Sequence, residues 1–118
     1  MKSANVLGLD WEGVITEYPT AMAALAQRFA SCVIITQKRS LTPSQVARYL
    51  RTNPEAVALE ICPSERQSDY QHWKAEMCLK HNVAFYLDDD PTVVNICKRQ
   101  CIPAVLVGRI PMYVQELD

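Results

Sequence analysis

The feature that most constrains the fold is an alternation of short apolar runs with stretches of helical period. Strand and helix units repeated in this way predict a parallel sheet with helices on both faces. The runs are continuously apolar, which is typical of strands covered on both sides. A three-layer α/β fold is therefore predicted. The five predicted strands are Asn5–Leu9, Cys32–Thr36, Ala56–Ile61, Val83–Leu87 and Ala104–Val107.

Four helices are predicted between these runs, and two of them have clear start signals. Thr42-Pro43-Ser44-Gln45 is a capping box, with Thr42 as N-cap and Gln45 bonding back to it. Asp90-Pro91 predicts a second N-cap. The side chains expected to face the core are Met22, Leu25 and Phe29 after Pro19; Val46, Tyr49 and Leu50; Tyr70, Trp73 and Met77 within Glu65–Lys80; and Val93, Val94, Cys97 and Cys101.

Length and charge limit the classes of protein to consider. A chain of 118 residues has the usual size of one domain, so a single domain over residues 1–118 is expected. The net charge of -1 gives no basic excess that would favour nucleic acid binding. No apolar run approaches the roughly 18 residues that span a bilayer, and the first apolar segment is too short for a secretory signal. A cytoplasmic protein without a membrane partner is expected.

The five cysteines are scattered and odd in number, unlike the dense, even set of a disulfide framework. Cys97 and Cys101 are four residues apart and are expected to share one face of the last helix. Their spacing matches no strong zinc pattern. They are therefore interpreted as small buried hydrophobic residues.

Polar residues follow several predicted strands, at the edge where ligands bind to open parallel sheets. Asp10 and Glu12 follow the first strand, and Asp88 and Asp89 follow the fourth. Two strand ends that each carry paired acids point to a site. The remaining strands are followed by Thr36-Gln37-Lys38-Arg39 at the second, Cys62-Pro63 at the third and Gly108-Arg109 at the fifth.

If the first and fourth strands are neighbours, these four carboxylates converge in one crevice. Two such charges about 4 Å apart repel by about 4 kcal/mol at an effective dielectric near 20. A cation must offset them, or some must take up protons. Mg²⁺ suits a site made of carboxylates, and Lys74 can supply a second positive charge. Mg²⁺, Lys74 and the Thr36 hydroxyl together suit a phosphoryl group.

In this order the residues resemble the motifs of the haloacid dehalogenase-like (HAD) hydrolase superfamily, which consists mostly of Mg²⁺-dependent phosphatases. LGLDWEGVIT is similar to the first motif, an apolar strand ending in Asp-x-Asp-Gly-(Thr/Val). CVIIT is similar to the second motif, and HWKAEM supplies the lysine of the third. AFYLDDDP is similar to the fourth, an apolar strand ending in paired Asp. The resemblance covers nearly the whole chain and implies a Rossmann-like sheet with strand order 5-4-1-2-3.

The resemblance also implies a role for each motif residue. Asp10 would be the nucleophile that forms an aspartyl-phosphate, and Glu12 the general acid and then the general base. The expected function is a Mg²⁺-dependent phosphomonoester hydrolase. The residues implied to bind phosphate are Thr36, Gln37 and Lys74. The groups implied to hold Mg²⁺ are Asp10, Asp88, Asp89 and the main-chain carbonyl of Glu12.

Two departures from the family pattern bear on function. Glu12 stands where the family has Asp, so the acid–base group is one methylene longer. A displacement near 1 Å can slow a reaction about a hundredfold. The segments after Gly13 and after Cys62 are short, so no cap domain is expected. The site should then be open, unless a second copy of the chain covers it.

An open site suits a large substrate, such as a phosphorylated macromolecular end or a nucleotide held partly outside it. The expected partner is a phosphorylated substrate, either a small molecule or a macromolecular end. Lys38 and Arg39 either contact such a substrate or lie in a solvated loop. Trp11 is expected to point away from Asp10, and it either packs in the core or forms a wall of the substrate pocket. The tail 112–118 is either a short strand or one helical turn.

Two other functions are compatible with these residues. One is a weakly active or inactive HAD-like binding or regulatory module, which Glu12 favours and the otherwise complete motif set does not. The other is a phosphoacceptor domain of the response-regulator type, which also combines paired acids, a phosphorylated Asp and Mg²⁺. Its phosphoacceptor normally follows the third strand, where this chain has Cys62-Pro63.

Overall fold

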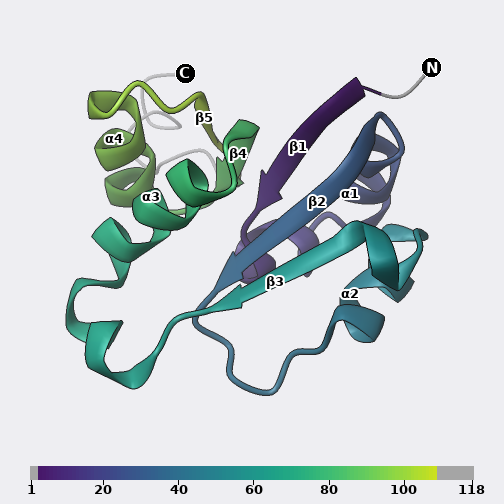
Figure 1. Cartoon of the computed structure of the whole chain (residues 1–118), viewed down its shortest axis with the longest axis horizontal. Helices are drawn as coiled ribbons and strands as arrows, with labels where there is room; N and C mark the ends of the chain where they lie inside the picture. The colour runs from purple at the N-terminus through teal and green to yellow at the C-terminus, as the bar shows by residue number, and fades with distance from the viewer. Residues whose placement is uncertain (1–2, 109–118) are drawn as a thin grey trace, which may run out of the picture.

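The computed structural model describes residues 3–108, in which a five-stranded parallel sheet lies between two pairs of helices (Figure 1). The strand order is β3-β2-β1-β4-β5. This is the predicted order 5-4-1-2-3 read in reverse, so the predicted α/β fold is confirmed. Arg109 and the tail 112–118, for which a strand or a helical turn is predicted, lie outside the described residues. The strands are β1 (Ser3–Leu9), β2 (Phe29–Thr36), β3 (Val57–Ile61), β4 (Val83–Asp88) and β5 (Ala104–Leu106).

The helices are divided equally between the two faces of the sheet. In Figure 1, α3 (Tyr70–Lys80) and α4 (Pro91–Arg99) lie together on one side, and α1 (Pro19–Ala26) and α2 (Pro43–Leu50) lie on the other. Short turns lie between strands and helices at η1 (Trp11–Ile15), η2 (Pro54–Ala56) and η3 (Ser64–Asp69). None of the helices between residues 3 and 108 combines the length and apolar character that a membrane crossing requires.

Both predicted helix starts are confirmed. The Thr42 hydroxyl accepts from the main-chain N–H of Gln45 at 3.3 Å, and the Thr42 N–H donates to the Gln45 side chain at 2.9 Å. The Asp90 carboxylate accepts from the N–H of Thr92 at 2.9 Å, so Asp90 caps α4. These bonds satisfy main-chain donors that the first helical turn leaves without partners.

Three residues expected on buried helix faces lie elsewhere. Phe29 begins β2, because the last turn of α1 tightens, with Arg28 N bonded to Leu25 O at 3.0 Å, and ends the helix before it. Tyr49 is 45% exposed, because its ring packs edge-on against Trp11 at the margin of the core. Cys101 is exposed beyond α4, where its positive φ of 61° ends the helical path, whereas Cys97 is buried as expected.

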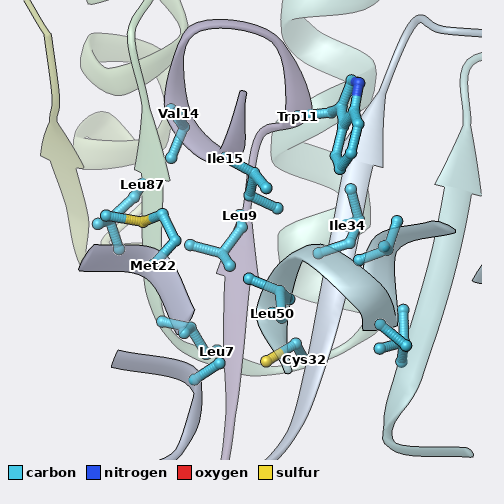
Figure 2. Close-up of a cluster of buried hydrophobic side chains, with 14 of the residues drawn as sticks. Leu7, Leu9, Trp11, Val14, Ile15, Met22, Cys32, Ile34, Leu50 and Leu87 are labelled. Carbon is cyan, nitrogen blue, oxygen red and sulfur yellow. The ribbon is translucent and has the colours of Figure 1, made fainter. Parts of the chain in front are cut away.

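Because side chains alternate in direction along the strands, they contribute to two separate hydrophobic cores. Leu7, Leu9 and Ile34 contribute to the cluster beneath α1 and α2, which Figure 2 shows in close-up. Val33 and Ile35 belong to the other cluster, on the side of α3 and α4. Trp11 is buried in the first cluster, so its role as a packing residue is supported.

Gly8 makes room for a ring that reaches toward the carboxyl edge of the sheet. Gly8 is paired with Tyr86 on β4. A Cβ at position 8 would lie 3.0 Å from Cδ1 of Tyr86 and 3.0 Å from Cγ1 of Val83. Because Tyr86 is fully buried, it has little space into which to move. Its hydroxyl donates to Asp88, so the missing side chain at position 8 helps to place a carboxylate.

Gly8→Ala should lower the free energy of unfolding by about 1–3 kcal/mol, because it overpacks the interface of β1 and β4. Urea denaturation measures the change. Val83→Ala removes one of the two crowding atoms, so the double variant should lose less stability than the sum of the single variants. Strictly additive losses would show that the contact between positions 8 and 83 is not the cause.

Candidate functional site

Asp10 and Asp88 lie side by side at the carboxyl edge of the sheet, because they follow or end neighbouring strands. Leu9 pairs with Leu87, and Asp10 N donates to Leu87 O at 3.0 Å. Asp10 is 5% exposed and Asp88 is fully buried. The first and fourth strands are therefore neighbours, as convergence of their acids requires. This pairing brings two carboxylates together away from water.

Lys74 bridges these two carboxylates from α3. Its Nζ donates to Oδ1 of Asp10 at 2.9 Å and to Oδ2 of Asp88 at 3.1 Å, and the side chain is almost fully buried. Burial lowers the pKa of Lys74, but Asp10 and Asp88 outweigh burial and raise that pKa above its ordinary value. Lys74 is therefore a charged ammonium that offsets one of the two acids.

Asp10 holds its proton more tightly than an ordinary carboxyl group. Burial, and then the charge of Asp88, raise the pKa of Asp10 to about 8, although Lys74 opposes the change. One ammonium is therefore too little positive charge for this cluster. A second cation would favour the ionised form of Asp10 and release its proton.

Asp88 is fixed by hydrogen bonds to both of its oxygens. Oδ1 accepts from Asp90 N at 2.9 Å, and Oδ2 accepts from the Tyr86 hydroxyl as well as from Lys74. Burial, and then Asp88, raise the pKa of Tyr86 well above its ordinary value, so this hydroxyl stays protonated and donates. The carboxylate of Asp88 therefore has little freedom to rotate.

Asp89 completes a group of three acids with Asp10 and Asp88. One carboxylate oxygen of each lies within 4.8 Å of the other two, and Asp89 is exposed. Gly13 passes close by with φ of 80°, and a Cβ there would lie only 2.0 Å from Oδ2 of Asp89. The turn therefore needs glycine for both conformation and space. Three converging oxygen donors fit a hard divalent ion such as Mg²⁺, without identifying the ion.

All seven residues that the sequence proposes for the site line one pocket of about 130 Å³. Thr36 is buried at the end of β2, and its hydroxyl accepts from Lys38 N at 3.0 Å, which leaves its own hydrogen to donate. Gln37 is exposed and bonded to Gln67. The lining residues are Asp10, Glu12, Thr36, Gln37, Tyr70, Lys74, Asp88, Asp89 and Asp90.

The pocket also contains residues that the sequence argument did not assign to it. The Tyr70 hydroxyl donates to Oδ2 of Asp90 at 2.9 Å, and both residues line the pocket. Tyr70 lies one helical turn before Lys74, and that spacing could have indicated it. Lys38 and Arg39 are absent from the described lining, and Arg39 instead donates to the Ser64 hydroxyl at 2.8 Å.

Comparison with protein-family models, with curated proteins and with solved structures finds no match to this chain. The roles of these residues are therefore inferred from their chemistry and geometry.

The raised pKa of Asp10 should make the stability of the metal-free protein depend on pH. Asp10 titrates at about 8 in the folded protein and near 3.8 when unfolded, so the folded state binds the extra proton between these values. The free energy of unfolding should fall as pH rises through this range, by up to about 1.4 kcal/mol per pH unit. Urea denaturation with a chelator present measures the slope. Asp10→Asn should flatten it, and an unchanged slope would contradict the assignment.

Lys74→Met should strongly destabilise the protein, because it leaves two buried acids without their cation. Breaking a buried ion pair in this way costs about 3–5 kcal/mol. Lys80→Met on the same helix is the matched control, because Lys80 is 60% exposed in its pair with Glu60. The control should change the free energy of unfolding by less than about 1 kcal/mol. Equal losses in the two variants would show that Lys74 does not hold the acids together.

Proposed function

We propose that this chain is a Mg²⁺-dependent phosphomonoester hydrolase of the HAD-like type that acts through an aspartyl-phosphate at Asp10. The observation that carries the proposal is the convergence of Asp10, Asp88 and Asp89 with Lys74 and the Thr36 hydroxyl in one pocket. Acids for a cation and donors for an anion, side by side, are the requirements of phosphoryl transfer.

The side chains of the pocket would have distinct roles when a phosphomonoester binds there. Asp10, Asp88 and Asp89 would hold Mg²⁺, which when bound offsets charge on the phosphoryl oxygens. Lys74 and Thr36 can donate hydrogen bonds to the same group, and Asp88 is already held by Tyr86 and Asp90. The donors are fixed before substrate arrives, so little reorganisation is needed in the transition state.

The proposed reaction has two balanced steps. A carboxylate oxygen of Asp10 attacks phosphorus, the bond from phosphorus to the alcohol oxygen breaks, and Glu12 gives that oxygen a proton. A water molecule then attacks phosphorus, and Glu12 takes the proton of that water. The bond from Asp10 to phosphorus breaks, inorganic phosphate leaves, and both side chains return to their starting states.

A second candidate is a weakly active or inactive binding or regulatory module of the same fold. Glu12 favours this candidate, because its exposed side chain is one methylene longer than the Asp that the HAD superfamily has at the equivalent position of its first motif. Its backbone is extended within the turn after β1, with φ -69° and ψ 128°. The carboxyl group can line the pocket and still miss the position that a leaving oxygen needs.

We also propose a cytoplasmic location, because Cys62, Cys78, Cys97 and Cys101 carry free thiols and such thiols are typical of reducing compartments. A homo-oligomer that covers the pocket remains a prediction.

Release of inorganic phosphate from a panel of phosphomonoesters, with and without Mg²⁺, tests the proposal. Release should require Mg²⁺ and should fall to background in Asp10→Asn, while Glu55→Gln, an exposed acid outside the pocket, should leave the rate unchanged. Release that persists in Asp10→Asn, or that needs no divalent ion, would contradict the mechanism.

Glu12→Asp separates the two candidates. A rate similar to wild type supports an enzyme adapted to Glu12. A rise of about a hundredfold, from a wild-type rate near background, supports the weakly active module. The same samples can be tested for phosphate that stays on Asp10, which would instead support a phosphoacceptor domain.

A further inference from the structure

A second and larger pocket, of about 350 Å³, adjoins the first at Asp89. Its described lining consists of Gly13, Glu17, Tyr18, Asp89 and Gly108. Asp89 lines both pockets, so a group held in the first is within reach of the second. The volume is within the range of small-molecule sites, about 300–1,000 Å³, whereas the first pocket of about 130 Å³ is below it.

Hydrogen bonds hold the main chain at Tyr18, which lines the second pocket. Tyr18 N donates to Val14 O at 2.9 Å, and Tyr18 O accepts from Met22 N at 3.0 Å. The main-chain N–H and the carbonyl group of Tyr18 are therefore both held by hydrogen bonds. The Tyr18 side chain also packs against the hydrophobic cluster beneath α1 and α2. Gly13 and Gly108 add no side chains, and both have positive φ. The pocket therefore offers an aromatic ring beside bare backbone.

The charge of the second pocket differs from that of the first. Glu17 and Asp89 are its acidic residues, and its lining within residues 3–108 includes no Lys or Arg. A second phosphate would be repelled there, whereas a neutral group with N–H donors could bond to Glu17. The first pocket, by contrast, contains Lys74 and the Thr36 hydroxyl. The described lining of the second pocket thus disfavours an anionic group, whereas that of the first suits one.

We infer that the second pocket binds the alcohol portion of the substrate, and that this portion is a neutral, ring-bearing group with N–H donors, as in a nucleoside monophosphate. The inference rests on the proposed function for the position of the phosphate. Tyr18 supplies a surface on which a planar base can stack. Glu17 supplies an acceptor for amino groups of that base. A phosphorylated nucleic acid end, with further phosphates close by, fits this pocket poorly.

Steady-state kinetics with matched substrates test the specificity. Adenosine 5′-monophosphate carries the ring, glycerol phosphate lacks it, and adenosine 3′,5′-bisphosphate adds a second phosphate. Tyr18→Leu should raise KM for the monophosphate about tenfold and leave KM for glycerol phosphate unchanged, while Tyr18→Phe should resemble wild type. Glu17→Lys should improve kcat/KM for the bisphosphate relative to the monophosphate. Equal effects of Tyr18→Leu on both monoesters would overturn the inference.

A binding measurement separates this inference from the proposed function. The chain has three glycines, so glycine-selective ¹⁵N labelling reports on Gly13 and Gly108 in the pocket and on Gly8 within the sheet. Adenosine alone should shift the first two amide signals and leave that of Gly8 in place. Such shifts without hydrolysis of any monoester would leave the nucleoside site standing and reject the phosphatase. Hydrolysis without shifts, and without preference for the nucleotide, would reject the nucleoside site alone.

Discussion

The buried contact of Lys74 with Asp10 and Asp88 is the interaction on which the rest of the structure depends. Parallel pairing of β1 with β4 forces two acids together at one edge of the sheet, and burial strengthens their repulsion. The ammonium, at 2.9 and 3.1 Å, makes this arrangement compatible with folding. Because Lys74 projects from α3, the packing of α3 on the sheet is what places the ammonium between the two acids. The remaining negative charge is what fits the site for a divalent ion.

Much of the fold can be predicted from the sequence, because its signals are local. Continuous apolar runs indicate strands buried on both faces, and Thr42 and Asp90 mark helix starts through bonds within one turn. The errors arise where tertiary contacts decide. Phe29 has helical spacing from Met22 and Leu25 but pairs in β2, and Tyr49 has core spacing but lies over Trp11. The spacing of apolar residues alone does not show where a helix ends, or which of those residues lies at the margin of the hydrophobic core.

The candidate site was predictable to the extent that it is built from strand ends. Asp10, Thr36 and Asp88 end or follow strands, and the topology of a parallel sheet brings such positions together. The hydroxyl of Tyr86 was not predictable from composition, because its bond to Asp88 depends on the space left by Gly8. The second pocket could not have been predicted from the sequence. It joins the turn after β1 to Gly108 after β5, and no local pattern relates those segments.

The central claim, that Asp10 is a nucleophile held ready by Lys74 and a divalent ion, is tested most directly by an experimental structure with Mg²⁺ and beryllium fluoride. Beryllium fluoride bonds to a carboxylate as a phosphoryl group does. The account predicts beryllium on an oxygen of Asp10, fluorines bonded by Lys74 and Thr36, and Mg²⁺ held by Asp10, Asp88 and Asp89. Beryllium on another carboxylate, or bound Mg²⁺ with Asp10 left unmodified, would contradict it.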